Sequence, residues 1–233
     1  MQRLDSTSSG QYFKQTADID QSNESWTPFD FSGHFDGNGK TISHVTIDLT
    51  GGYYVGFFRQ LLSGGELNNV GLKEVNVKGS YFVGGLVGSA AASSSISNCY
   101  ASGNVNGTSY VGGLVGRTSG SISNSYTLGS VKGTSYVGGL VGYAAASSIS
   151  DCYASGSVKG ISAVGELIGS AVSSNITNSY YDSVTANLPD NAFGSRRTTK
   201  EMKEGTPSPT IYTGWDSTIW DFGDDTDYPT LRK

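Results

Sequence analysis

The sequence predicts an all-β fold, a parallel β-helix of about five to six coils with a cap at each end. The first observation is a repeated phrase, "YVGGLVG", at Tyr110–Gly116 and again at Tyr136–Gly142. The second is its spacing, since the first valine of the phrase and its variants recurs at steps of 28, 28, 26 and 27 residues: Val55, Val83, Val111, Val137 and Val164. The third is composition, because Gly makes up 33 of 233 residues and only 15% are charged, which is not typical of ordinary helices.

Residues 1–52 are expected to hold an N-terminal cap and the first coil. Short strands are predicted in "DIDQ" and "TISHVTID", with Trp26, Phe29 and Phe31 closing the apolar end. A cap is needed because the first coil of a solenoid presents an unpaired strand edge that would recruit other chains. "FDGNGK" (Phe35–Lys40) is interpreted as a tight turn, with a calcium loop as the alternative.

Residues 53–184 are predicted to form the repeated coils, with three strands in each. The "YVGGLVG" phrase supplies one strand, phrases such as "ISNCYASG" from Ile96 the second, and short phrases such as "GSVKG" from Gly129 the third. Each piece is short, rich in Val, Ile and Tyr, and bounded by Gly, Ser and Asn, which is typical of strands between turns. A helical repeat would need about ten or more residues of 3.6 periodicity, and a β-propeller four strands in about 40 residues, so neither fits.

Copies of one position should lie over one another at the strand spacing of about 4.8 Å. One such row lies at a bend, where its side chains either hydrogen-bond to the backbone along the stack or simply form turns: Asn69, Asn98, Asn124, Asp151 and Asn178. Paired glycines such as Gly112 and Gly113 predict a bulge or bend where no Cβ fits. A second aromatic row shares the parity of the inward Ile and is expected in the core: Tyr100, Tyr126, Tyr153 and Tyr180.

Residues 185–233 are expected to cap the other end of the stack. "TTKEMKE" begins with a capping-box pattern, Thr198 to Glu201, which predicts one short helix. Four large aromatic residues are then expected to plug the last coil: Trp215, Trp220, Phe222 and Tyr228. Without this plug the open edge should cause aggregation.

Charge and hydropathy exclude two classes of partner. The formal net charge is −5 and the only basic cluster is Arg196 with Arg197, so the stripe that neutralises nucleic-acid phosphates is missing. No apolar run approaches the roughly 18 residues that span a bilayer, so membrane insertion is not expected. The opening "MQRLDSTSSGQYF" lacks the apolar core of a signal peptide, and a leader would lie outside this sequence.

The phrases "YVGGLVG" and "ISNCYASGNVNG" resemble the GLUG repeat, and the flanks Tyr12–Asp48 and Ser195–Lys233 resemble the segments around such repeats. GLUG repeats occur in bacterial and archaeal surface proteins, including adhesin-like and hemagglutinin-type proteins and some immunoglobulin-A proteases. The resemblance implies a right-handed parallel β-helix outside the cell. Proteolysis is not carried over, because His34 and His44 are the only histidines and neither belongs to an H-E-x-x-H motif.

The chemistry of the coils also argues against an enzyme. Between Ser80 and Ser170 the only acidic residues are Asp151 and Glu166, which leaves no paired carboxylates for glycoside hydrolysis. Basic residues that a polysaccharide lyase would need lack an acidic cluster for calcium beside them: Arg117, Lys132 and Lys159. There is also no nucleophile-elbow motif for a Ser-His-Asp arrangement.

Cys99 and Cys152 hold the same slot in coils separated by one unit, where Ser125 takes that slot. Two coil steps put their Cα atoms about 9.6 Å apart, beyond the roughly 7 Å limit for a bridge. We therefore predict two free thiols and no disulfide, with both residues as small packing groups.

Two candidate sites remain. An acidic stretch has the look of a calcium loop without full EF-hand spacing: Asp221, Asp224, Asp225 and Asp227. We expect no other cofactor. An aromatic row precedes the inward valines by one residue and should stand outside under strict alternation: Tyr54, Phe82, Tyr110 and Tyr136. Such a row can bind a sugar or a protein, or it can stabilise the sheet by stacking alone.

These inferences predict a non-enzymatic, adhesin-type module at the cell surface or outside the cell, binding a glycan or protein partner. Alternatives are a passive spacer within a larger surface protein and a polysaccharide-acting β-helix enzyme. The chain is expected to be a monomer or part of a larger chain.

Overall fold

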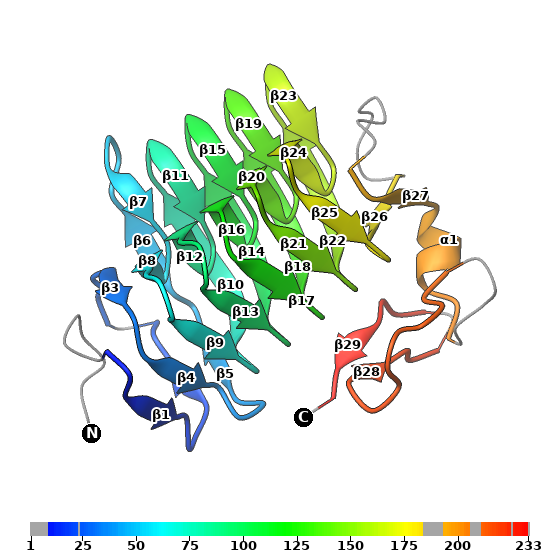
Figure 1. The fold of residues 1–233 in the computed structure, drawn as a ribbon, viewed down its shortest axis with the longest axis horizontal. Helices are drawn as coiled ribbons and strands as arrows, with labels where there is room; N and C mark the ends of the chain where they lie inside the picture. Colours follow the sequence, from blue (N-terminus) through cyan, green and yellow to red (C-terminus); the bar gives the residue numbers. More distant parts are fainter. Residues whose placement is uncertain (1–8, 23, 184–192, 206–210, 225, 233) are drawn as a thin grey trace.

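A computed structural model describes residues 9–22, 24–183, 193–205, 211–224 and 226–232. The chain forms a parallel β-solenoid whose coils follow one another along the long axis, with the N-terminal coils at one end and the C-terminal segment at the other (Figure 1). Four parallel sheets run along the stack, with seven, nine, six and five strands, and are named here sheets A, B, C and D. The predicted fold class is confirmed.

Sheets A and B form two sides of the stack. Sheet A contains β1 (Tyr12–Lys14), β4 (His34–Asp36), β9 (Glu66–Asn68), β13 (Ser95–Ser97), β17 (Ser121–Ser123), β21 (Ser148–Ser150) and β25 (Asn175–Thr177). Sheet B contains β2 (Ile19–Asp20), β5 (Thr41–Ser43), β6 (Thr46–Asp48), β10 (Gly71–Lys78), β14 (Tyr100–Asn106), β18 (Tyr126–Lys132), β22 (Tyr153–Lys159), β26 (Tyr180–Asp182) and β27 (Ser195–Arg197).

Sheets C and D are built from the repeated phrase itself. Sheet C contains β3 (Phe29–Phe31), β8 (Phe58–Leu61), β12 (Val87–Ala90), β16 (Val115–Thr118), β20 (Val141–Ala145) and β24 (Ile168–Val172). Sheet D contains β7 (Tyr53–Val55), β11 (Tyr81–Gly84), β15 (Ser109–Gly112), β19 (Ser135–Gly138) and β23 (Ser162–Gly165), the upper row of strands in Figure 1.

Each complete coil therefore carries four strands, and the predicted three-stranded coil is wrong. The phrase is two strands rather than one, because the chain bends sharply between β15 and β16 at Gly113 and Leu114. A Cβ on Gly112 would collide with the carbonyl oxygen of Val115, so the bend brings backbone against backbone. The paired glycines thus mark a bend, as predicted.

Equal positions of successive coils pair in register, which confirms the predicted stacking of copy on copy. Val83, Val111 and Val137 pair along sheet D. Ile96 and Ile122 pair along sheet A. All five side chains are buried in one continuous apolar core, so the repeated valines and isoleucines supply the burial that stabilises the stack.

The polar row lies at the corner between sheets A and B, and its backbone is left-handed at every coil, with φ of 54° at Asn69, 53° at Asn98 and 46° at Asn124. Asn is among the few residues that adopt this conformation at low cost, which explains its choice. Asn69 Nδ2 donates to Asp36 Oδ1 at 3.0 Å and Asn98 Nδ2 to Asn68 Oδ1 at 2.9 Å. Both hydrogen bonds join two side chains, whereas the ladder considered from the sequence would join side chains to the backbone.

The described part of the N-terminal segment contributes the first strands of sheets A, B and C. β1 pairs with β4, and β3 pairs with β8, both parallel. Trp26 stacks on Phe57 with ring centroids 4.0 Å apart, and its Nε1 donates to the Phe57 carbonyl oxygen at 2.6 Å. "FDGNGK" is a tight turn between β4 and β5, in which Asp36 Oδ1 accepts from the Asn38 N–H at 2.8 Å.

The C-terminal segment differs from its predicted position. β27 pairs with β26 and extends sheet B by one strand, and α1 (Thr199–Met202) follows with the predicted capping box between Thr198 and Glu201. The chain then turns back along the side of the stack, where β28 (Trp220–Asp221) and β29 (Thr230–Leu231) pair antiparallel. The predicted boundary between the repeats and this segment falls in residues 184–192, outside the described residues.

The predicted plug is therefore a lateral cover, and the second aromatic row is not part of the solenoid core. The rings of this row and those of the returning segment form a separate apolar cluster on the outer face of sheet B: Tyr126, Tyr153, Tyr180, Met202, Ile211, Tyr212, Trp215, Trp220 and Phe222. Tyr153 Oη donates to the Pro229 carbonyl oxygen at 2.6 Å. The alternation of residues along the strand predicted the wrong side for this row. Its rings are buried by the C-terminal segment, which is distant in sequence.

Candidate functional site

The aromatic row of sheet D forms a ladder, defined here as Tyr54, Phe82, Tyr110 and Tyr136. Successive ring centroids lie 4.9, 4.8 and 4.6 Å apart, and the rings are stacked nearly parallel. All four side chains are half-buried. The ring faces therefore cover one another, and the ring edges rather than the faces meet the solvent along most of the row.

The backbone beneath the ladder is left-handed, with φ of 58° at Tyr54, 55° at Phe82, 58° at Tyr110 and 54° at Tyr136. Strict strand alternation does not hold here, which is why the rings are half-buried. The next coil packs closely on this backbone, since a Cβ on Gly116 would lie 2.6 Å from the carbonyl carbon of Phe82. A left-handed conformation costs an ordinary residue about 1–2 kcal/mol, so each ring carries a local penalty.

Two of the left-handed rows use different kinds of residue. The corner between sheets A and B uses Asn or Asp, which local physical chemistry favours, whereas the ladder uses Tyr and Phe, which it does not. Ala163 occupies the ladder slot in the last coil and keeps the same conformation, with φ of 51°. The left-handed backbone therefore does not depend on the aromatic side chain. The rings must be explained by their own contacts.

A row on sheet C runs beside the ladder, and its members pair in register: Gln60, Ser89, Arg117, Tyr143 and Ser170. Tyr143 packs edge-on against two ladder rings, with centroids 5.7 Å from Tyr110 and 5.8 Å from Tyr136. Sequence reasoning missed Tyr143, because no other coil has an aromatic residue in that slot. The neighbouring Arg59 is held by an ion pair with Asp30.

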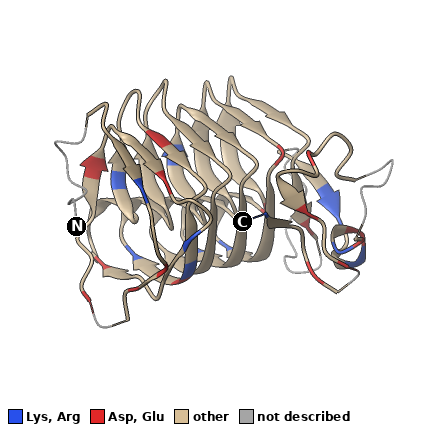
Figure 2. Cartoon of the chain, turned by 90° about the horizontal axis from the view of Figure 1, so that it is seen from below, with Lys and Arg blue, Asp and Glu red and all other residues tan. Residues whose placement is uncertain are grey.

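Charged side chains lie mostly in the N-terminal coils and the C-terminal segment, and the middle of the stack is largely uncharged (Figure 2). Between Lys78 and Lys132 the sequence contains one charged residue, Arg117, in the row beside the ladder. A surface of this kind offers hydroxyl groups and ring edges rather than a strong field, which favours uncharged partners.

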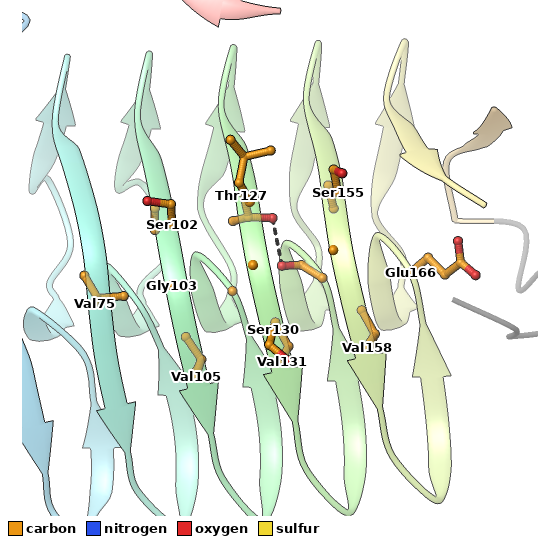
Figure 3. Close-up of a pocket in the computed structure, with 17 residues that line it drawn as sticks. Val75, Ser102, Gly103, Val105, Thr127, Ser130, Val131, Ser155, Val158 and Glu166 are labelled. Carbon is orange, nitrogen blue, oxygen red and sulfur yellow. Dashed lines mark hydrogen bonds between the residues drawn. The ribbon is translucent and has the colours of Figure 1, made fainter. Parts of the chain in front are cut away.

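Two hollows among the described residues are too small for an organic ligand. One lies between the bend of sheet B and the turns of the repeated phrase (Figure 3) and has a volume of about 20 Å³. Thr127 Oγ1 donates there to the Gly139 carbonyl oxygen at 2.9 Å. A second hollow, of about 30 Å³, lies beside Tyr100 and Leu231. Each of these two hollows has room for only one or two water molecules.

The described carboxylates of the C-terminal acidic stretch make turn contacts with the backbone. Asp224 Oδ1 accepts from the backbone N–H of Thr226 at 2.8 Å, and Asp221 Oδ1 accepts from that of Gly223 at 3.2 Å. Asp227 is exposed, and Asp225 lies outside the described residues. No group of three His, Cys, Asp or Glu in the described part of the chain is arranged to hold a metal ion. The two described carboxylates with these bonds act as turn-forming groups.

Both cysteines are free and fully buried. Ser125 lies between them, as the spacing predicted, and its Oγ accepts from the backbone N–H of Cys99 at 3.1 Å. Burial raises the pKa of the Cys99 thiol to about 12 and also raises the pKa of the Cys152 thiol. Neither is therefore suited to nucleophilic chemistry.

The two histidines hold the N-terminal coils together. His34 Nδ1 lies 2.7 Å from Glu66 Oε2, and its ring stacks on that of Tyr12 at 4.2 Å. His44 lies between two carboxylates, 2.8 Å from Asp20 Oδ1 and 3.1 Å from Glu74 Oε2. Its pKa is raised, chiefly by the hydrogen bond with Asp20. Neither histidine lies beside a nucleophile in these contacts.

Comparison with known proteins agrees with the repeats. The GLUG motif matches residues 79–106, 107–132 and 133–159. The chain carries GLUG repeats. Halomucin of Haloquadratum walsbyi is 36% identical over 102 residues, which covers 36% of this chain and 1% of halomucin. The chain thus spans a very small part of that relative.

The fold has a counterpart among solved structures. The crystal structure of a candidate immunoglobulin A1 protease from Bacteroides ovatus superposes with a TM-score of 0.74 at 20% sequence identity, covering 96% of this chain and 87% of that one. At this identity the likeness concerns the fold alone. Within the described part of the chain, no helix has the length and apolar character needed to cross a membrane.

Proposed function

We propose that this chain is a non-enzymatic module displayed outside the cell, which binds a glycan or protein partner through the face formed by the aromatic ladder and the row beside it. The observation that carries the proposal is the choice of Tyr and Phe in a left-handed slot, where Asn or Gly would cost less. Strained residues repeated at one surface are a reason to infer a role for that surface.

The location and the module character rest on similarity. The three GLUG repeats and the match to a short part of halomucin support a unit of a longer extracellular protein. The solenoid is rigid and extended, so a partner would meet several coils at once, each contributing modest affinity. The same rigidity would serve a spacer, which is the alternative that the experiment must separate.

The absence of catalysis is also part of the proposal. The hollows inside the stack are about the size of a water molecule, and an active site needs a cleft that holds its substrate. The described carboxylate contacts near the histidines lie on exposed strands of the N-terminal coils, and the described acidic turns are exposed as well. A lyase assay with uronate polymers and calcium tests this part, because formation of unsaturated products would contradict it.

The binding proposal is tested with an array of glycans and extracellular proteins, read with the labelled chain. We expect saturable binding that weakens when ring edges are removed by a double variant, Phe82→Leu with Tyr143→Leu. The control is Tyr12→Leu, which removes an exposed ring at the N-terminal end, away from the ladder. If the folded chain, checked by circular dichroism, binds no glycan and no protein even at millimolar ligand concentration, the proposal is contradicted and a spacer role is favoured.

A further inference from the structure

The aromatic ladder ends one coil before sheet D does. Strand β23 follows β19 in register, with Ser162 beside Ser135 and Val164 beside Val137. The ladder slot between these pairs holds Tyr136 in β19 and Ala163 in β23. Ala163 is exposed and keeps the left-handed backbone of the slot. The outer face of the Tyr136 ring is therefore followed by a methyl group where the repeat elsewhere places a ring.

The space above Ala163 has the height of one ring. Stacked ladder rings lie 4.6 to 4.9 Å apart, which matches the strand spacing of about 4.8 Å. A flat ring that entered the Ala163 slot would stack on Tyr136 at the distance that Tyr110 already keeps from its other side. The Ala163 methyl group forms the floor of this space, on strand β23, and the face of the Tyr136 ring forms one of its walls.

The remaining side of the slot is polar. Tyr143 lies edge-on between Tyr110 and Tyr136, and Ser170 is its register partner in the next coil. By the repeat, Ser170 borders the space between Tyr136 and Ala163 as Tyr143 borders the space between the two rings. Ser170 is half-buried and brings a hydroxyl group that can donate or accept.

We propose that the space above Ala163, bounded by Tyr136 and Ser170, is a subsite for a pyranose ring of an uncharged glycan. This inference rests on the proposed function and names its ligand and its place. A pyranose ring has an apolar face that stacks on an aromatic ring and hydroxyl groups at its edge that suit Ser170. A sugar carries hydroxyl groups all around its edge, so several orientations of the stacked ring can pair with Ser170, whereas the rings of Phe have no such group.

The other end of the ladder does not offer the same site. Tyr54 lies in β7, the first strand of sheet D, so no strand of that sheet forms a floor beyond its outer face. The Arg59–Asp30 ion pair also lies on the strands next to it. The two terminal rings thus form a natural comparison, in which only the Tyr136 face is part of a slot.

The test uses neutral tetrasaccharides of glucose, galactose, mannose and N-acetylglucosamine, screened by saturation-transfer NMR and titrated by calorimetry with the strongest binder. Two variants remove the open face of the Tyr136 ring. Ala163→Leu covers this face with a larger side chain. Tyr136→Leu removes the ring itself, and the new Leu side chain covers Tyr110, so that the next ring does not become exposed. The matched control is Tyr54→Leu at the opposite end. N-acetyltyrosinamide and a tetragalacturonate serve as competing probes.

We expect each of the two variants to raise Kd at least about tenfold, with the control within about twofold of the parent chain. Ala163 is exposed, so Ala163→Leu should retain the melting temperature of the parent chain, and it keeps the test open if Tyr136→Leu folds poorly. If the parent chain binds a tetrasaccharide and both variants bind equally well, the subsite is wrong while the proposed function stands. Preference for N-acetyltyrosinamide or for the galacturonate would overturn the neutral-sugar assignment. If the parent chain binds no glycan and no protein, the proposed function itself fails.

Discussion

Replacing one ladder ring by Asn separates the two roles that the ladder could have. Tyr110→Asn keeps a residue that tolerates φ of 58° and removes the ring. The ring contacts Phe82 at 4.8 Å, Tyr136 at 4.6 Å and Tyr143 at 5.7 Å. The variant therefore relieves backbone strain and loses three aromatic pairs at once.

The lost stacking energy and the relieved backbone strain differ enough in size to predict whether Tyr110→Asn lowers or raises stability. An aromatic pair contributes about 0.5–1.5 kcal/mol beyond area burial, so three pairs contribute about 3 kcal/mol. The relief of the left-handed penalty returns about 1.5 kcal/mol. These two effects leave a loss of about 1.5 kcal/mol, to which the lost burial of the half-buried ring adds, so Tm should fall by at least about 3–6 °C for a chain of this size.

The measurement is thermal unfolding by circular dichroism, with calorimetry on the same samples. Ala163→Asn is the matched control, because it lies in the same slot with φ of 51° and has no ring to lose. It should be as stable as the parent chain or more so. If Tyr110→Asn also keeps or raises Tm, stacking does not offset the strain, and the rings would be retained for contact with a partner alone.

Three further predictions concern the rest of the chain. Trp220 is fully buried against the side of sheet B, so Trp220→Ala should cost about 3–5 kcal/mol and make the C-terminal segment sensitive to limited proteolysis, whereas Trp26→Ala at the other end should leave that segment protected. The pKa of His44 is raised by its hydrogen bond with Asp20, so its stabilisation is fully present below the ordinary histidine pKa and is lost as pH rises through the raised value. Protection of the N-terminal coils from proteolysis should fall over that range in the parent chain and stay flat in His44→Gln. Both cysteine thiols are buried, so they should react with a thiol reagent only after denaturation, and fast labelling of the native chain would contradict their placement.

The repeats made most of the fold predictable. The register of Val111 on Val137 followed from copy number and spacing alone, because a parallel stack is the arrangement that buries short identical strands. The fourth strand was missed because Gly112 and Gly113 were interpreted as a local bend within one strand. The close approach of Gly112 to the carbonyl oxygen of Val115 lies within one copy of the phrase, but the pairing of β15 and β16 into different sheets appears only when the coils are stacked.

The site was predictable only in part. The ladder was found as a row, but its left-handed backbone was not, because Tyr is a poor indicator of that conformation. The buried state of Tyr126 came from Trp220, a residue 94 positions away, and no periodic pattern indicates such a contact. Tyr143 occurs once in its slot, so a search for repeated residues passes over it.

The row beside the ladder has a consequence for how such a protein can change. Four of its five members differ in kind, Gln60, Ser89, Arg117 and Tyr143, while the valines beneath the neighbouring strands stay the same. A coil can therefore be given a new outer residue without repacking the interior, and duplicating a coil would lengthen the exposed face by one strand spacing of about 4.8 Å. If the proposed binding face is correct, the residues that contact a partner and the residues that form the core occupy different positions of the repeat, so substitutions in one coil can alter binding without altering the core.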